Sequence, residues 1–218
     1  MKSNPLATRF VAPGKLPWQP QRGQSLSQIY TRFTQELHYR AAIVGAHGSG
    51  KSTLLEHLVP MIGRLRLRRS TYGSQTEPEA TESEVATRRS VVWLQMRGRT
   101  PSRKLLLETR ATWARRECVL VIDGYEQLSR VSRTLAFSLS RLSGAGLLVT
   151  THRPMWLPTL IETHVDVALA RELLNQLLPP DDVHREQFLD EHRLSGLLDK
   201  HHGNLRELFM ELYDEVEN

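Results

Sequence analysis

The sequence predicts an α/β fold built on a mostly parallel β-sheet. Short apolar runs alternate along the chain with stretches of helical spacing, which is the pattern of strands joined by crossover helices. The run at residues 118–122 (Cys-Val-Leu-Val-Ile) is uninterrupted, as expected of a central parallel strand covered on both faces. Helical spacing alone marks the C-terminal end, so we expect a small helical unit to follow the sheet.

The first 40 residues predict a leader and one helix. Residues 1–25 are rich in Pro, Gly and Gln, which favours an extended segment. Ser25 stands where a helix N-cap is expected, and apolar residues follow at helical spacing from Leu26 to Leu37. We therefore assign 1–40 to an N-terminal leader and helix.

Residues 41–170 contain the strands of the predicted sheet and the helices that cover it. In chain order we expect a strand over 41–44, a helix over 52–62, strands over 64–69 and 90–95, a helix over 102–115, a strand over 118–122, a helix over 126–142, and strands over 146–150 and 164–168. Residues 70–87 are acidic, polar and low in complexity, so we expect a disordered loop there.

Residues 171–218 predict a helical lid. Its clearest element begins behind Gly203-Asn204, where apolar residues recur at helical spacing from Leu205 to Val216. The chain is therefore predicted to consist of a leader (1–40), a sheet-containing core (41–170) and a lid (171–218).

Composition excludes several classes of protein. With 39% hydrophobic residues in 218, the chain can build one sizeable core and is neither collagen-like nor wholly disordered. Its single cysteine, Cys118, cannot form an internal disulfide. No apolar run approaches the roughly 18–20 residues that span a bilayer, and residues 1–5 do not resemble a signal peptide. We expect a cytoplasmic protein without a membrane partner.

Charge is distributed unevenly. Residues 1–154 carry 24 basic and 10 acidic residues, whereas residues 155–218 carry 5 basic and 14 acidic ones. A basic body permits a nucleic-acid or acidic-protein partner, although solvated arginine-rich faces account for the same pattern.

The strongest motif is Gly45-Ala46-His47-Gly48-Ser49-Gly50-Lys51-Ser52, which fits G-x-x-x-x-G-K-[ST] between a predicted strand and a predicted helix. Glycines let the backbone curl so that successive N–H groups converge on phosphate oxygens, beside the positive end of the helix. We expect these residues and Thr53 to bind a nucleotide. Lys51 is expected to reach the β- and γ-phosphates, and the Ser52 hydroxyl to ligate Mg²⁺.

Two acidic residues follow the apolar run at 118–122. Asp123 ends the predicted strand in the Walker B pattern, where its carboxylate would hold Mg²⁺. Glu126 is the next acidic residue and is placed to activate the attacking water, although a first-turn Glu favoured by the helix dipole is the alternative.

The strand predicted at 146–150 ends in Thr150-Thr151-His152-Arg153. A polar side chain here can contact the γ-phosphate or position water. The sequence does not choose between Thr150 and Thr151.

Together these motifs resemble the ATPase core shared by the AAA+ and STAND superfamilies of P-loop NTPases. The Asp123-Gly124-Tyr125-Glu126 turn is similar to the Walker B variant of NACHT-type STAND ATPases. The segment 203–206 (Gly-Asn-Leu-Arg) resembles the sensor-2 motif of the AAA+ lid, which implies that Arg206 touches the nucleotide phosphates. The resemblance implies a three-layer sandwich, ATP as ligand with Mg²⁺, and a leader that wraps the adenine.

The sequence also departs from that pattern. Where the family usually has two acidic residues at the end of the Walker B strand, this chain has Asp123-Gly124. No arginine is marked as the arginine finger, and the candidates are Arg130, Arg133, Arg141 and Arg153. We expect no output domain after the lid, so output is expected from a protein partner, self-assembly into a homo-oligomer, the leader, or the arginine-rich segments.

Three functions follow from these observations. The first is a Mg-dependent, AAA+/STAND-like ATPase in which Lys51, Asp123, Glu126, Thr150 or Thr151, and Arg206 carry the chemistry. The second is a nucleotide-dependent binding switch for nucleic acid or a protein, with little intrinsic hydrolysis. The third is a small-molecule phosphotransferase, against which the C-terminal position of the lid argues.

Overall fold

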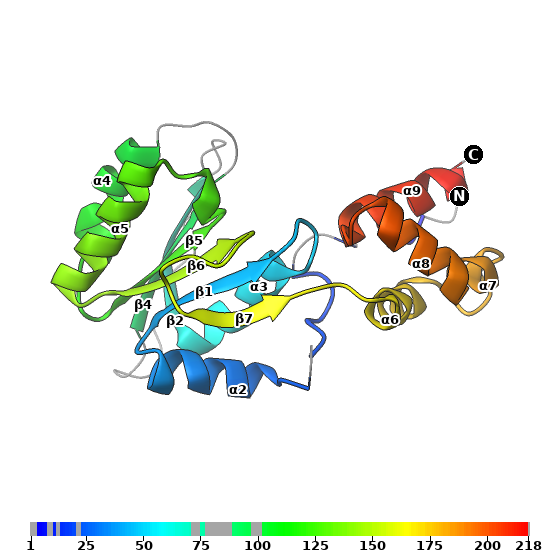
Figure 1. Cartoon of the computed structure of the whole chain (residues 1–218), viewed down its shortest axis with the longest axis horizontal. Coiled ribbons are helices and arrows are strands. Elements are labelled where there is room, and N and C mark those ends of the chain that lie inside the picture. The colour runs from blue at the N-terminus through cyan, green and yellow to red at the C-terminus, as the bar shows by residue number, and fades with distance from the viewer. Residues whose placement is uncertain are drawn as a thin grey trace.

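The computed structural model describes residues 4–7, 11, 14–20, 23–70, 75–76, 89–96 and 102–217. Within these residues it contains a mostly parallel, seven-stranded sheet with helices on both faces, and a helical group beyond the sheet (Figure 1). The α/β fold expected from the alternation of strands and helices is confirmed. Among the described residues, no helix has the length and apolar character that crossing a membrane requires.

The sheet places the strand that precedes the glycine-rich loop near its centre. In spatial order its strands are β3 (Gln75–Thr76), β2 (Gly63–Ser70), β4 (Arg89–Gln95), β5 (Cys118–Asp123), β6 (Gly146–Thr151), β1 (Arg40–Gly45) and β7 (Thr159–Thr163). All neighbours are parallel except β2 and β3. Because β6 lies between β1 and β5, the carboxyl ends of these three strands are adjacent at one edge.

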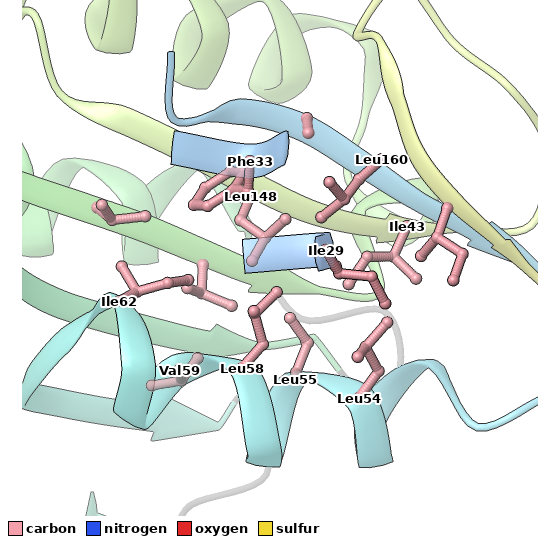
Figure 2. Packing of buried hydrophobic residues seen from close by; sticks show 14 of the residues in the cluster. Ile29, Phe33, Ile43, Leu54, Leu55, Leu58, Val59, Ile62, Leu148 and Leu160 are labelled. Carbon is pink, nitrogen blue, oxygen red and sulfur yellow. The ribbon is translucent and has the colours of Figure 1, made fainter. Parts of the chain in front are cut away.

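Alternation along β1 separates the core into two layers. Ala41 and Ile43 pack against α2 (Leu26–Thr31), the π-helical turn η1 (Arg32–Glu36) and α3 (Lys51–Ile62). Figure 2 shows side chains from these elements in contact beneath the sheet. Ala42 and Val44 face α4 (Ser102–Trp113) and α5 (Arg130–Ser143) on the opposite side. Strand β5 is buried along its whole length, as its uninterrupted apolar run predicts.

The start of the helix predicted after Ser25 is confirmed. The Ser25 hydroxyl accepts from the Gln28 N–H at 3.2 Å, and the Gln28 side-chain oxygen accepts from the Ser25 N–H at 2.8 Å. This reciprocal pair is a capping box, which satisfies two N–H groups that the helix leaves free.

The C-terminal helices form a third hydrophobic cluster beside the sheet. They are α6 (Val167–Leu177), α7 (Arg185–Phe188), α8 (Glu191–Lys200) and α9 (Leu205–Glu217). Leu6 of the leader is buried in this cluster, whereas Trp18 belongs to the cluster under the sheet. The Asn4 amide also donates to the Tyr213 carbonyl at 3.2 Å. The leader therefore contacts both the helical group and the sheet-containing core.

The strand expected over 164–168 is wrong. The last strand is β7, and helix α6 begins at Val167 because the Asp166 carboxylate accepts from the Leu169 N–H at 2.8 Å and caps it. The helical group therefore starts before the expected boundary at residue 171.

The single helix expected over 126–142 is also wrong. Residues Tyr125–Gln127 form a short 3₁₀ turn (η2), and α5 starts only after Ser129, whose hydroxyl accepts from the Ser132 N–H at 3.1 Å. Leu128 is extended between them, which breaks the helix.

Most of the loop expected over 70–87 lies outside the described residues. Within it, Ser70 ends β2, and Gln75–Thr76 form β3, which pairs with β2.

Candidate functional site

The glycine-rich loop connects β1 to α3 at the carboxyl edge of the sheet. Gly48 and Gly50 have positive φ values of 68° and 88°, and Gly50 is the N-cap of α3. A left-handed backbone favours glycine, which accounts for Gly48 and Gly50 of the loop. The loop delivers its backbone to the N-terminal end of a long helix, which is suited to an anion.

Two side chains hold the loop in this shape. The Lys51 ammonium donates to the carbonyls of Gly45 and Ala46 at 2.7 and 2.6 Å. The Ser49 hydroxyl lies 2.7 Å from that of Thr163 on β7. Thr53 lies in the first turn of α3, where its carbonyl is 3.1 Å from the His57 ring.

Lys51 is the buried cation of this edge, with 9% of its surface exposed. Burial lowers the pKa of its ammonium, and the carboxylates of Glu126 and Asp123 oppose that effect. Both acidic residues that the sequence singled out therefore act electrostatically on the lysine of the loop.

The carboxylate of Asp123 joins three segments of the chain. One oxygen, Oδ2, accepts from the Ser52 hydroxyl at 2.9 Å, and Oδ1 accepts from the Thr150 hydroxyl at 2.7 Å. The Gln95 amide at the end of β4 donates to Oδ2 at 3.4 Å. Sequence analysis missed Gln95; the signal was a polar residue closing the strand next to β5.

Thr150 and Thr151 have different partners. The Thr150 hydroxyl bonds Asp123, whereas that of Thr151 donates to the carbonyl of Arg153 at 3.0 Å. Because side chains alternate along a strand, only one of two neighbours reaches the carboxylate. The structure brings Thr150 into the site, whereas the side chain of Thr151, at the end of β6, bonds the segment that follows the strand.

Glu126 lies in the η2 turn, with its carboxylate beside His152. Its Oε1 is 2.9 Å from His152 Nε2. Its Oε2 is buried and makes no hydrogen bond within the described part of the chain. One oxygen is thus held, and the other is a free acceptor.

His152 is a second residue that sequence analysis missed. Its Nδ1 is 3.1 Å from the carbonyl of Gly45, and its ring centroid is 3.8 Å from that of His47 in the loop. The available signal was its place directly after Thr150-Thr151 on a strand adjacent to β1.

The last helix of the helical group begins against the loop. A Cβ on Gly48 would lie 1.9 Å from Asn204 Oδ1, so the start of α9 packs directly on the loop backbone. Asn204 Oδ1 also accepts from the Arg206 N–H at 3.2 Å. The Arg206 side chain is exposed and has no hydrogen bond or ion pair to the residues that the structure describes.

One candidate for the arginine finger, Arg133, bonds main-chain carbonyls in and just after the η2 turn. Arg133 Nε donates to the Leu128 carbonyl at 2.9 Å, and its NH2 group donates to the Glu126 carbonyl at 3.3 Å. Arg130 and Arg153 are exposed. Arg141 lies near the end of α5, its guanidinium 5.8 Å from the Phe137 ring centroid.

The oxygen pair of Ser52 and Asp123 suits a hard cation. A hydroxyl and a carboxylate are ligands that Mg²⁺ accepts when phosphate oxygens and water complete its octahedron. In the described ranges, no cluster of three or more His, Cys, Asp or Glu forms a metal site of its own.

No protein-family profile matches the chain, and a search of the curated proteins gives no significant match.

Proposed function

We propose that this protein is a Mg-dependent ATPase of the P-loop, AAA+/STAND-like type, which couples ATP binding and hydrolysis to movement of the helical lid. The observation that carries the proposal is the carboxylate of Asp123, which accepts hydrogen bonds from Ser52 of the loop and Thr150 of the neighbouring strand. A phosphate-binding loop, an acidic residue and a strand-end hydroxyl are joined in one hydrogen-bonded group.

The loop supplies the phosphate contacts. Its backbone from Gly45 to Gly50 and the N-terminal end of α3 would face the β- and γ-phosphates, and Lys51 would exchange its two carbonyl partners for phosphate oxygens. Ser52 and Asp123 would hold Mg²⁺. The metal would neutralise charge on the phosphate oxygens.

Glu126 is the proposed general base. The water oxygen bonds the γ-phosphorus while the bond from that phosphorus to the β–γ bridging oxygen breaks, and one water proton passes to Glu126. ADP leaves with the bridging oxygen, and inorganic phosphate is the second product. The free Oε2 supports this role because it is an acceptor without a partner among the described residues.

The lid would report the state of the nucleotide. Asn204 packs on the loop at Gly48, so a phosphate that reshapes the loop displaces the start of α9. Arg206, one residue into α9, would swing onto the phosphates. Adenine as the base, and a homo-oligomer or protein partner as the output, rest on the family resemblance; the cytoplasmic location stays a prediction.

A second candidate is a nucleotide-dependent switch that binds nucleic acid. Arg40, Arg89 and Arg141 lie close enough that the latter two lower the pKa of Arg40, after the larger effect of burial. Arg40 and Arg89 bond main-chain carbonyls, and within the described ranges none of the three pairs with a carboxylate. Such uncompensated positive charge, at the strand starts and away from the loop, favours a phosphate backbone.

Steady-state ATP hydrolysis with Mg²⁺, across a protein concentration series, tests the first proposal. We expect turnover in the wild type, loss of nucleotide binding in Lys51→Ala, and retained binding with turnover lowered about 10²–10⁴-fold in Glu126→Gln. Specific activity that rises with protein concentration would indicate assembly. Normal turnover by Glu126→Gln would refute the base assignment. ATP binding without turnover, together with salt-sensitive DNA binding, would favour the switch.

A further inference from the structure

Three side chains from separate segments form a contact chain at the edge of the site. Glu126 comes from the η2 turn, His152 directly follows β6, and His47 comes from the glycine-rich loop. His152 touches both of the others, with Nε2 2.9 Å from Glu126 and its ring centroid 3.8 Å from that of His47. The two imidazole planes are tilted by 45°.

We propose that His152 is a positioning residue that orients the Glu126 carboxylate so that this base can activate the attacking water, and that His47 holds His152 in place. The inference rests on the proposed ATPase function and adds to it a residue that directs the base. Because His47 belongs to the glycine-rich loop, the loop itself would help to hold the general base in position.

The ring of His152 is fixed at both nitrogens. Nε2 meets the Glu126 carboxylate and Nδ1 meets the Gly45 carbonyl at 3.1 Å. Both partners accept hydrogen bonds, so a doubly protonated ring donates to both, and a singly protonated ring donates to one. The proposed role needs a proton on Nε2, because only then does the ring donate a hydrogen bond to the Glu126 carboxylate.

Holding Oε1 leaves Oε2 as the acceptor. A carboxylate on a two-carbon stem rotates freely unless one oxygen is fixed, and Oε2 is the buried oxygen without a partner in the described structure. The His152 contact therefore fixes Oε1 and leaves Oε2 as the oxygen that would accept the proton of the reacting water.

The backbone of the turn is held independently of His152. Arg133 donates to the carbonyls of Glu126 and Leu128 at 3.3 and 2.9 Å, and Gly124 N–H donates to the Thr150 hydroxyl at 2.8 Å. Removing His152 should free the Glu126 side chain and leave the η2 turn in place.

The surroundings of His47 favour the neutral form of its ring. Burial lowers its pKa first, and the neighbouring His152 and Lys51 lower it further, while Glu126 and the lid residue Glu207 oppose them. The neutral form that this favours adds no positive charge beside Lys51. Through this contact, a change in the position of the loop would move His152 and, with it, the Glu126 side chain.

The experiment compares variants that keep different parts of the contact. His152→Phe keeps a ring against His47 and loses both hydrogen bonds. His152→Gln keeps an amide donor for Glu126. The matched control is His192→Phe, because His192 is exposed on α8. The readouts are kcat and KM for ATP hydrolysis, the Kd of a non-hydrolysable ATP analogue, and the melting temperature.

We expect His152→Phe to lower kcat by about 10–100-fold, while KM and the analogue Kd stay within about twofold, because a misoriented base slows the chemical step. His152→Gln should recover a substantial part of kcat. His47→Phe should keep more turnover than His47→Ala. The control should match the wild type.

Several results would overturn the inference. The first is an unchanged or raised kcat in His152→Phe. The second is a change in KM as large as the fall in kcat. The third is no recovery of kcat in His152→Gln when both variants melt like the wild type. Turnover that is lost in Glu126→Gln but kept in His152→Phe contradicts this inference alone. A wild type that binds no ATP, or activity that survives Lys51→Ala, contradicts the proposed function as well.

Discussion

The hydroxyl of Thr150 donates to Asp123 Oδ1 at 2.7 Å and accepts from the N–H of Gly124 at 2.8 Å. It therefore uses both of its hydrogen-bonding capacities on the segment that follows β5. Strand β6 is tied to the acidic turn by a side chain in addition to the sheet ladder.

Replacing Thr150 by Val keeps the volume and removes the hydroxyl. We expect the free energy of unfolding to fall by about 1–3 kcal/mol, because a buried N–H and a carboxylate oxygen lose their partner. Chemical denaturation measures it, with Thr134→Val on the exposed side of α5 as the control. A variant as stable as the wild type would contradict the assignment of Thr150 as the residue that fixes Asp123.

Replacing Ser52 by Ala should weaken the cation site. The hydroxyl at 2.9 Å from Asp123 is one of two proposed protein ligands, so we expect the Mg²⁺ concentration for half-maximal turnover to rise about tenfold or more. A Mg²⁺ titration of ATP hydrolysis measures this shift. Ser27→Ala, exposed on α2, is the control, and an unshifted titration in Ser52→Ala would remove Ser52 from the ligand set.

Removing the guanidinium of Arg206 should weaken nucleotide binding. If the side chain reaches the phosphates, its loss costs about 1.5–3 kcal/mol, or roughly 10–150-fold in the Kd for ATP. Arg171→Ala, exposed at the start of the helical group, tests whether any lost lid charge has the same effect. Equal Kd values for the two variants would reject Arg206 as a phosphate contact.

The packing of α3 on the sheet should dominate stability. Leu58 is fully buried beneath β1, so we expect Leu58→Ala to lower the free energy of unfolding by about 2–5 kcal/mol. Leu142 is 84% exposed, and Leu142→Ala should change it by no more than about 0.5 kcal/mol. Urea denaturation separates the two, and similar midpoints would contradict the burial of α3.

Cys118 should react with alkylating reagents only after unfolding. Burial raises the pKa of its thiol to about 11, whereas an exposed thiol titrates near about 8.5. At pH 8.5 the folded protein keeps the unreactive thiol, and the unfolded chain is half thiolate. Mass spectrometry after iodoacetamide treatment, with and without urea, measures the difference; rapid labelling of the folded protein would contradict it.

The raised pKa of Cys118 also makes the stability of the folded protein depend on pH. Because the folded state keeps its proton where the unfolded state loses it, the Cys118 contribution is complete below about pH 8.5 and declines as pH rises towards about 11. Cys118→Ala should flatten this part of the pH–stability curve.

The sequence was sufficient for features that depend on local pattern. The short apolar run of β1, the buried run of β5 and the Ser25 cap each need only neighbouring residues, and each is found. The cap of α6 at Asp166 was equally local and was missed, because the apolar residues around it also fit a strand.

Relations across the sheet were beyond such reasoning. Thr150 and Thr151 are adjacent, and only the register of β6 beside β5 decides which one meets Asp123. Gln95 and His152 join the site because β4 and β6 both flank β5. Their roles follow from the order of the strands in the sheet, which cannot be predicted from neighbouring residues alone.

The leader gives the helical group a second attachment. One covalent connection runs from β7 into α6, and another runs between Leu6, buried among the lid helices, and Trp18, buried under the sheet. Two connections restrict the movement of the helical group relative to the sheet more than one connection would. Cutting the leader between these two anchors should therefore let α9 move more freely over the loop.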